Sequence, residues 1–421
     1  MAFAWLFSSN KKVVNFRVIF WGIIIQLIFA FIIFIFPPGA TLFIWVNDIV
    51  IKVMNSTAAG AEFVFGRLAL PPGVKNASGE ESIGFFLAFQ AFPTIIFFSA
   101  LMSILYFYGV MQKIIKGFAF IFTKLMKISG AESLCASSNI FVGIESSLTI
   151  RPFLEKMTKS ELTTVLTAGM ATVASNVLAI YVFSLRSYFP TIAAHLVSAS
   201  FLSAPAAIIM SKIIVPETDT PETLGRHIEV DYKSENNVFE AVINGANAGL
   251  RLIAGIVALL IAVLGIVALA NLFIGGIGSK INNIAGLSID WSLSGLLGYI
   301  FYPLTIVLGV PLSDVSVISK IIGERMIVTE VTAYRDLAQA ISTGAVSSGR
   351  SIVICAYALC GFAHLASMAI FIGGISAIAP KITPTLSKVG LRALVAATLA
   401  CLMTACIAGA FYTSGSIIFG K

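Results

Sequence analysis

Long apolar runs separated by short polar segments dominate the sequence. About 20 apolar residues are needed for a helix to cross a bilayer, and the stretches Val18–Phe36 and Ile83–Val110 reach that length. Basic residues before the first run ("NKKVVNFR") and after the second (Lys113–Lys127) place both of these ends on the cytoplasmic side. Between the two spans, residues 40–80 predict an amphipathic interfacial helix followed by an outer loop.

The later apolar runs are of two kinds. Three are plain and predict simple spans: 191–214, Leu252–Ser279 and Leu391–Phe411. Two are interrupted by polar residues, Thr163–Phe183 by "TVASNV" and Ser351–Ala379 by "CGFAHLASM". Residues 131–148 and 293–334 are too short, or too broken by small, proline and acidic residues, to cross as simple helices.

These segments form two units with one layout. Each unit, residues 131–214 and 300–411, has a broken segment, then a polar-interrupted helix, then a plain helix. Corresponding broken segments in two halves are typical of inverted-repeat transporters, whose sites lie near the middle of the bilayer. We therefore expect an all-α polytopic membrane protein with inverted repeats, two re-entrant helical hairpins and two partly unwound transmembrane helices.

Composition supports a membrane protein and argues against several other classes. Of 421 residues, 58% are hydrophobic and only 11% are charged, whereas soluble domains have about 25% charged residues. The net charge of +7 fits basic cytoplasmic loops better than nucleic-acid binding, for which no basic motif is present.

The sequence predicts neither an enzyme nor a metalloprotein. Its five cysteines lie in apolar runs without metal-type spacing, its three histidines form no cluster with them, and no nucleophile–base arrangement suggests catalysis. The apolar start "MAFAWLFSS" is too short for a span or a signal peptide, so no cleavable signal is expected.

Several long motifs, in order from about residue 10 to about residue 413, resemble the concentrative nucleoside transporter (CNT) family. The motifs are "NIFVGIESSLTIRPFLEKMTKSEL", "GYIFYPLTIVLGV", "TEVTAY", "YALCGFAHLASMAIFIGGISAIAP" and "GLRALVAATLACLMTACIAG". The resemblance implies a multi-pass homotrimer in a bacterial inner membrane. It also implies secondary active import of nucleosides, usually with Na⁺ and in some bacterial members with H⁺.

The resemblance further implies a static scaffold and a transport domain that moves like an elevator. The expected segments are scaffold helices with the interfacial helix (1–130), the first transport-domain repeat (131–235), a scaffold helix (236–292) and the second transport-domain repeat (293–421). The family's first helix is expected to be shortened here to the stub "MAFAWLF".

The resemblance assigns four residues to a sodium site: Asn139, the backbone of Val142, Thr172 and Val173. Na⁺ needs a shell of oxygen ligands, and the ends of broken helices supply carbonyl oxygens. The alternative for these polar groups is an interhelical contact worth about 0.6 kcal/mol.

Two intramembrane glutamates match substrate contacts of the family. Glu145 is expected at the nucleoside base, whose N–H donors suit a carboxylate, and its alternative partner is Arg151. Glu330 is expected to accept hydrogen bonds from ribose hydroxyls, and its alternative partners are Arg325 and Arg335.

Three further residues match the family's pocket. Phe362 corresponds to an apolar wall, although plain packing would also explain it. Ser367 corresponds to a ribose contact, and Val177 to a base-side position reached through water.

The sequence departs from the family pattern at the pocket. Ile144 replaces a polar Gln-Thr pair, with one residue missing, so the base side is expected to be more apolar. His364 replaces an asparagine and is open to three roles: ribose contact, proton coupling or structure. These changes motivate an alternative cargo, a purine nucleoside or nucleobase-like solute coupled to H⁺. A channel or an intramembrane enzyme is the third possibility.

Overall fold

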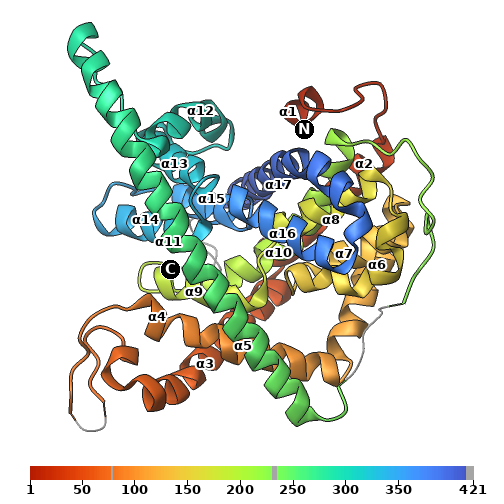
Figure 1. Ribbon diagram of the computed structural model, residues 1–421, viewed down its shortest axis with the longest axis horizontal. Helices are drawn as coiled ribbons and strands as arrows, with labels where there is room; N and C mark the ends of the chain where they lie inside the picture. The colour runs from red at the N-terminus through yellow and green to blue at the C-terminus, as the bar shows by residue number, and fades with distance from the viewer. Residues whose placement is uncertain (77–78, 230–234, 414–421) are drawn as a thin grey trace.

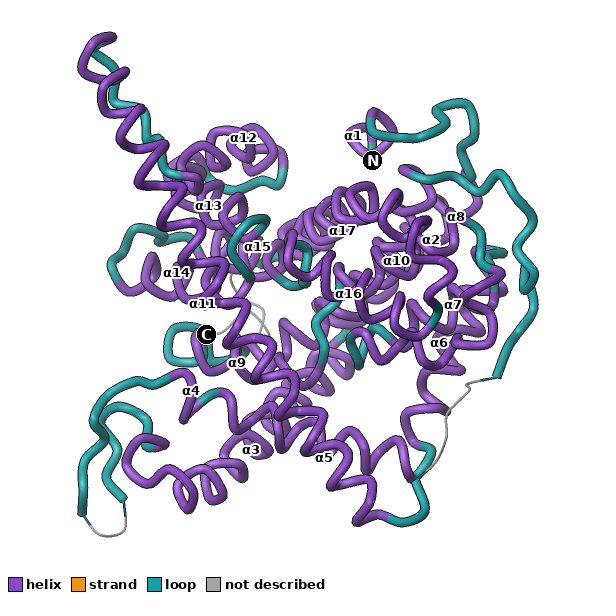
Figure 2. Tube along the Cα trace, viewed as in Figure 1, coloured by secondary structure: helices purple, strands orange, loops and turns teal. Residues whose placement is uncertain are grey.

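A computed structural model describes residues 1–76, 79–229 and 235–413 (Figure 1). These residues are almost entirely helical, and among them the only β-type pairings are two isolated bridges. Figure 2 shows helices throughout, joined by loops and turns. Six helices are long and apolar enough to cross a membrane. The predicted fold class, an all-α polytopic membrane protein with two broken repeats, is confirmed.

The N-terminal third forms a set of helices around the first two predicted spans. Its elements are α1 (Ala2–Leu6), α2 (Phe16–Phe34), α3 (Pro37–Phe65), the 3₁₀ helix η1 (Gly66–Ala69), α4 (Leu87–Gln90) and α5 (Phe92–Phe107). The predicted first span agrees with α2 to within two residues at each end. The predicted amphipathic helix is α3, which begins at the Pro37-Pro38 pair because proline suits the first helical turn.

The two repeats have the same element order. The first contains α6 (Val110–Met126), α7 (Gly130–Ser138), the 3₁₀ helix η2 (Ile144–Lys156), α8 (Lys159–Ala171), α9 (Ser175–Leu185) and α10 (Ile192–Ile214). The second contains α12 (Leu293–Val307), α13 (Leu312–Arg325), α14 (Glu330–Ser342), α15 (Gly349–Leu359), α16 (Leu365–Ile378), the 3₁₀ helix η3 (Pro380–Ile382) and α17 (Thr383–Phe411). We call α7–η2 hairpin 1 and α13–α14 hairpin 2.

Each interrupted span is two helices joined by extended backbone, as predicted. In the first repeat, Thr172 is extended after α8, and α9 then begins at Ser175, whose N–H donates to the carbonyl of Phe141 in the turn of hairpin 1 at 3.0 Å. In the second, Leu365 opens α16 and its N–H donates to the carbonyl of Met326 in the turn of hairpin 2 at 3.2 Å. Each hairpin turn therefore caps one broken helix.

The repeats also cross each other. The return arm of hairpin 1, η2, packs on α16 of the second repeat, and the return arm of hairpin 2, α14, packs on α9 of the first. Helices α8 and α15 both pack on α17, while α8 also packs on α10. The hairpins and broken helices thus form one interlocked body, in which α8 and α15 bury most of their side chains.

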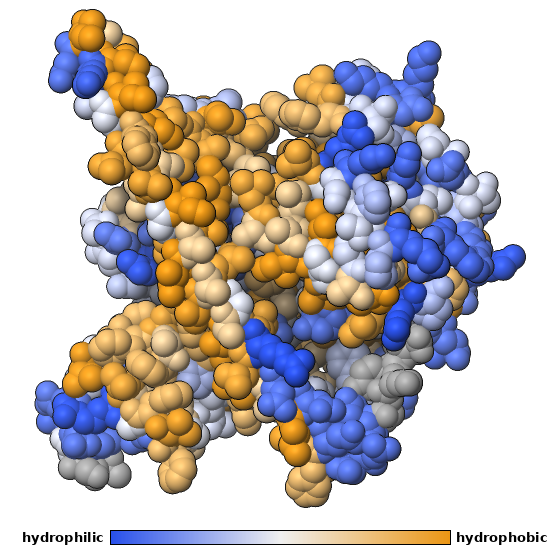
Figure 3. Space-filling view, in the orientation of Figure 1, coloured by the Kyte–Doolittle hydropathy of each residue, from blue (hydrophilic) through white to orange (hydrophobic). Residues whose placement is uncertain are grey.

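A single long helix, α11 (Val238–Ala285, 48 residues), runs diagonally across this body in Figure 1. It packs closely on α5 and contains the predicted uncharged span Leu252–Ser279. Figure 3 shows an apolar surface along much of its length, and none of its most apolar window is buried. Hydropathy identified only the apolar part of α11 and α17, because both helices continue through polar residues. The predicted division into scaffold and transport domain stays a prediction.

A buried ionic cluster fixes the start of hairpin 1. Lys212 on α10 is 4% exposed, and its Nζ lies 2.8 Å from an oxygen of Glu132, 3.4 Å from Glu217 and 3.0 Å from the Ser160 hydroxyl. Glu132 also closes a capping box at the start of α7 with Ser129. One ammonium group therefore ties hairpin 1 to α8, to α10 and to the loop that follows α10.

Replacing this ammonium group should destabilise the protein. The change Lys212→Met leaves buried carboxylates without their partner, and we expect unfolding to become easier by about 3–5 kcal/mol. The matched control is Lys156→Met, because Lys156 forms an exposed 3.1 Å pair with Glu222 that is worth about 1 kcal/mol or less. Thermal unfolding of the purified protein in detergent measures both, and equal effects of the two changes would contradict the expectation.

Candidate functional site

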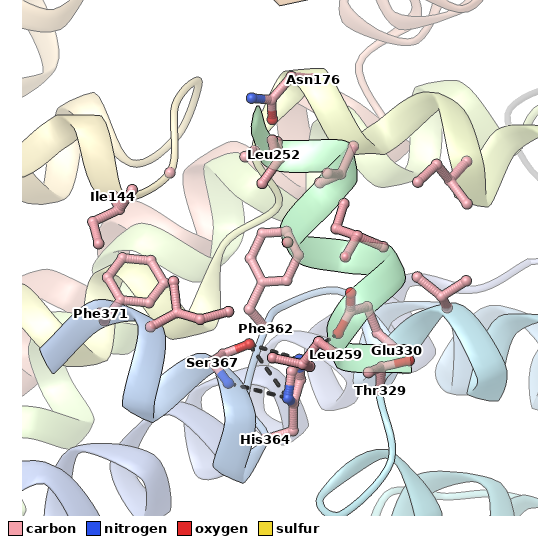
Figure 4. A pocket seen from close by; sticks show the side chains of 18 of the residues that line it. Ile144, Asn176, Leu252, Leu259, Thr329, Glu330, Phe362, His364, Ser367 and Phe371 are labelled. Atoms are coloured by element: carbon pink, nitrogen blue, oxygen red, sulfur yellow. Dashed lines mark hydrogen bonds and ion pairs between the residues drawn. The ribbon is translucent and has the colours of Figure 1, made fainter. Parts of the chain in front are cut away.

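A cavity of about 300 Å³ lies where the hairpins, the broken helices and α11 meet (Figure 4). Pockets of this size and mainly apolar lining are typical of small-molecule sites. All seven residues predicted to contact substrate line it: Ile144, Glu145, Val177, Glu330, Phe362, His364 and Ser367. They come from both repeats, so the cavity exists only because the hairpins cross.

Glu330 is the most firmly held polar group of the cavity. It is 4% exposed and begins α14. One carboxylate oxygen accepts a hydrogen bond from the Tyr181 hydroxyl at 2.8 Å, and the other lies 2.8 Å from Nε2 of His364. The alternative pairs with Arg325 and Arg335 are not formed. One hydrogen bond and one close contact with the imidazole thus hold the carboxylate while it lines the cavity.

His364 connects this carboxylate to the break in the second repeat. It is the N-cap of α16, and its Nδ1 accepts a hydrogen bond from the Ser367 N–H at 3.2 Å. Because Nδ1 accepts, the proton of the neutral ring belongs on Nε2, the nitrogen that faces Glu330 at 2.8 Å. Nε2 also lies 2.6 Å from the Ser367 hydroxyl. The histidine therefore holds the helix start, the carboxylate and the serine in one arrangement, drawn with dashed lines in Figure 4.

Glu145 faces the same cavity from hairpin 1. Its side chain is exposed to this space, next to Gly143, whereas Glu330 is almost completely enclosed. Among the described residues Glu145 forms no ion pair, so the alternative pair with Arg151 is absent. The cavity thus presents one fixed and one accessible carboxylate.

Ile144 supplies an apolar wall beside Glu145. A Cβ atom at Gly374 on α16 would lie 2.1 Å from Cδ1 of Ile144. A larger residue at this position would require the Ile144 side chain to shift from its contact with α16. Phe371 and Phe362 extend the same apolar surface (Figure 4).

Sequence reasoning missed several lining residues. Tyr181 follows Val177 by one helical turn, so the i, i+4 spacing on α9 could have placed both on one face. Asn176, in the quoted break "TVASNV", has a buried side-chain oxygen without a partner among the described residues. Arg251 and the leucines of α11 also line the cavity, and only the packing of α11 across the repeats reveals them.

The four predicted sodium ligands lie outside the cavity lining, at the turn of hairpin 1 and the break after α8. The Ser175–Phe141 hydrogen bond joins these two segments. Asn139 is 0% exposed, its amide nitrogen donates to the Cys135 carbonyl at 3.0 Å, and its Oδ1 has no partner among the described residues.

The chemistry of this second group suits a monovalent cation. The Thr172 hydroxyl donates to the Ala168 carbonyl at 2.9 Å, which leaves its oxygen free to accept or to bind an ion. Among the described residues, no group of three or more His, Cys, Asp or Glu could hold a metal ion. Neutral oxygen atoms, one of them an unpartnered amide oxygen, are ligands that suit Na⁺ better than a transition metal.

An apolar helical bundle with two re-entrant hairpins, two broken helices and a cavity lined from both repeats is typical of multi-pass membrane transport proteins. Family models agree with this class along the chain. The model "Na+ dependent nucleoside transporter C-terminus" matches residues 195–409, its N-terminal counterpart matches residues 1–68, and "Nucleoside recognition" matches residues 88–188. The chain belongs to the concentrative nucleoside transporter family.

Similar proteins include bacterial and animal members. Nucleoside permease NupC of Helicobacter pylori is 35% identical over 97% of this chain and 94% of its own length. Solute carrier family 28 member 3 of Rattus norvegicus is 37% identical over 96% of this chain. The chain spans only 56% of that relative's length and 58% of the Eptatretus stoutii relative.

Solved structures of CNTnw match over nearly the whole chain. The inward-facing, substrate-bound structure has a TM-score of 0.85 and 34% identity, and covers 97% of this chain and 94% of its own. A doubly substituted variant in an outward-facing state also has a TM-score of 0.85, with 33% identity and the same coverage.

The role of His364 as a helix cap is testable without any ligand. His364→Ala removes the cap and a partner of Glu330, so we expect it to lower stability by about 1–3 kcal/mol. His364→Asn supplies both a capping oxygen and an N–H donor, and it should recover most of that loss. Thermal unfolding of the two variants in detergent measures the difference, and equal losses would contradict the capping role.

Proposed function

We propose that this protein is a secondary active symporter that imports nucleosides together with Na⁺ by elevator-type alternating access. The observation that carries this proposal is the cavity in which Glu330, held by Tyr181 and His364, shares one space with the accessible Glu145. Intramembrane carboxylates are costly and mark substrate or ion pathways. Two of them on one enclosed cavity suit a neutral solute that has donors at both ends.

The distribution of polarity matches a nucleoside. At one end, Glu330 and Ser367 can accept hydrogen bonds from vicinal hydroxyls, as a fixed carboxylate does well. At the other, Asn176 can meet the polar edge of a base, and Phe362 lies between the two ends (Figure 4). Glu145 also lines the cavity and offers the base a further acceptor. An apolar middle with polar ends fits a flat ring joined to a sugar.

The position of the predicted sodium ligands, Asn139, Val142, Thr172 and Val173, supports sodium coupling. Asn139 and Val142 lie in the turn that leads directly to Glu145, so an ion at this seat would order the arm that carries a substrate contact. Binding of the ion and the solute would then be thermodynamically linked, as symport requires. The family model's description as Na⁺ dependent supports the same ion.

Alternating access is proposed to move the interlocked body of hairpins and broken helices against α5 and α11. The cavity lies at this boundary, because α11 contributes Leu252, Ile256 and Leu260 to its wall. The proposal includes a homotrimer in the bacterial inner membrane. The H⁺-coupled, nucleobase-like alternative gains no support from the comparisons, and the His364 geometry assigns this residue a capping role.

The transport proposal is tested with labelled uridine and adenosine in proteoliposomes, with and without a Na⁺ gradient. We expect concentrative uptake only when Na⁺ is high outside, and none when choline replaces it. Absence of uptake of every nucleoside under either gradient would contradict the proposal. Uptake driven equally well by a proton gradient would replace Na⁺ by H⁺ as the coupling ion.

Glu330→Gln should weaken substrate binding while keeping the side chain's shape. Losing a charged acceptor costs about 1.5–3 kcal/mol, so KM for uridine should rise about 10- to 100-fold, with each tenfold worth about 1.4 kcal/mol. The matched control is Glu324→Gln in the same hairpin, because Glu324 does not line the cavity. A KM unchanged in Glu330→Gln would remove this residue from the substrate site.

Asn139→Ala should act on the ion rather than on the solute. The change removes Oδ1, the unpartnered oxygen of the predicted sodium site. Because one contact with the ion is lost, the Na⁺ concentration for half-maximal uptake should rise about tenfold or more. The KM for uridine at saturating Na⁺ should change little. If uridine affinity falls while the Na⁺ dependence stays as in the wild type, the assigned sodium seat is wrong.

A further inference from the structure

Arg325 carries a fully buried positive charge that the proposed transport cycle does not yet use. It is 0% exposed at the end of α13, beside the turn of hairpin 2. Its Nη1 donates to the Ala358 carbonyl at 2.8 Å, while Nε and Nη2 have no hydrogen-bond acceptor among the described residues. Glu330, five residues later, pairs with His364 instead.

A buried charge without a counter-ion is costly unless its surroundings compensate it. Ala358 is the second-last residue of α15, so the guanidinium lies at the negative end of that helix dipole. The Cys401 thiol lies against the same group, and that thiol in turn points to the Cys360 carbonyl at 3.3 Å. The guanidinium is therefore surrounded by neutral groups whose negative partial charges point toward it. Such a binding site also suits a free monovalent cation.

The first repeat places its proposed sodium seat at the corresponding point. Asn139 directly follows α7 and Arg325 is the last residue of α13, so the two side chains are one position apart when the helix ends are aligned. Both turns bind the first residue of the second half of a broken helix, through Ser175–Phe141 and Leu365–Met326. In each repeat, the hairpin turn is thus bonded to the start of the second half of the broken helix, and in the second repeat Arg325 also reaches the last turn of α15 through the Ala358 carbonyl.

We propose that the guanidinium of Arg325 is a tethered cation that fills, in the second repeat, the seat that the first repeat offers to a mobile Na⁺. This inference rests on the proposed function. The attached cation holds hairpin 2 on α15 throughout the cycle, whereas hairpin 1 is ordered only when its ion binds. One mobile cation therefore accompanies each nucleoside, because the second seat is always occupied.

The test compares three variants with the wild type. Arg325→Met removes the guanidinium group and leaves a shorter apolar side chain, Arg325→Lys keeps the charge, and Arg335→Met removes an exposed arginine from the same hairpin as a control. We expect Arg325→Met to lose about tenfold or more of uridine uptake, because the buried Ala358 carbonyl loses its donor and hairpin 2 loses this bond to α15, and Arg325→Lys to keep most of it. Low-millimolar guanidinium should restore uptake in Arg325→Met and leave the wild type and Arg335→Met unchanged.

A second measurement does not depend on transport. Guanidinium at the same concentrations should raise the unfolding temperature of purified Arg325→Met in detergent, but not that of the wild type or of Arg335→Met. This stabilisation would support the tethered cation even if the wild type transported no nucleoside. Absence of transport would contradict only the proposed function. No stabilisation of folded Arg325→Met, together with equal loss in Arg325→Lys, would overturn the inference.

The wild type provides a third measurement that holds if Arg325→Met does not fold. The reversal potential of uridine flux in proteoliposomes gives the number of Na⁺ ions moved with each nucleoside. The tethered cation predicts one. A ratio of two would show that a second mobile ion has a seat, and would contradict the inference.

Discussion

Two backbone hydrogen bonds make the architecture possible. A helix that breaks inside hydrocarbon exposes N–H and carbonyl groups that must find partners within the protein. Here the N–H groups that open α9 and α16 donate to carbonyls in the turns of hairpins 1 and 2. Each hairpin therefore compensates the break of its own repeat, and each break in turn holds a hairpin turn at membrane depth. If the hairpin turn were removed, the broken helix would have unsatisfied N–H groups, and if the broken helix were removed, the hairpin turn would have unsatisfied carbonyl groups.

The polar groups of the protein are arranged around this constraint. The breaks leave helix ends whose carbonyls and N–H groups face inward, and the charged and polar side chains collect beside them. Glu330 opens one helix, His364 caps another, and Asn139 ends a third. Around Glu330 and His364 the cavity lining is mainly apolar, so their polar contacts are made with little competition from water. Selectivity can then depend on a few well-held groups.

The repeats, the breaks and most pocket residues could be predicted from the sequence, because they depend on local patterns and motifs. Hydropathy located every long apolar run, and the motif around "TEVTAY" placed Glu330. Contacts between elements far apart in the chain could not be predicted in this way. The bond from Tyr181 to Glu330 joins residues 149 positions apart, and the packing of Ile144 against Gly374 exists only because η2 crosses onto α16. Helix ends were also missed where polar residues continue an apolar helix, as in α11 and α17.

The length of α11 has a consequence for the lipid around the protein. Its uncharged stretch, Leu252–Ser279, measures about 42 Å at 1.5 Å per residue, whereas the hydrocarbon core is about 30 Å thick. A helix of that length matches such a core only when it is strongly tilted or when the bilayer around it adjusts its thickness. A thinner membrane makes it lean further, and because its residues form one wall of the cavity, lipid composition becomes a variable that adjusts the shape of the site.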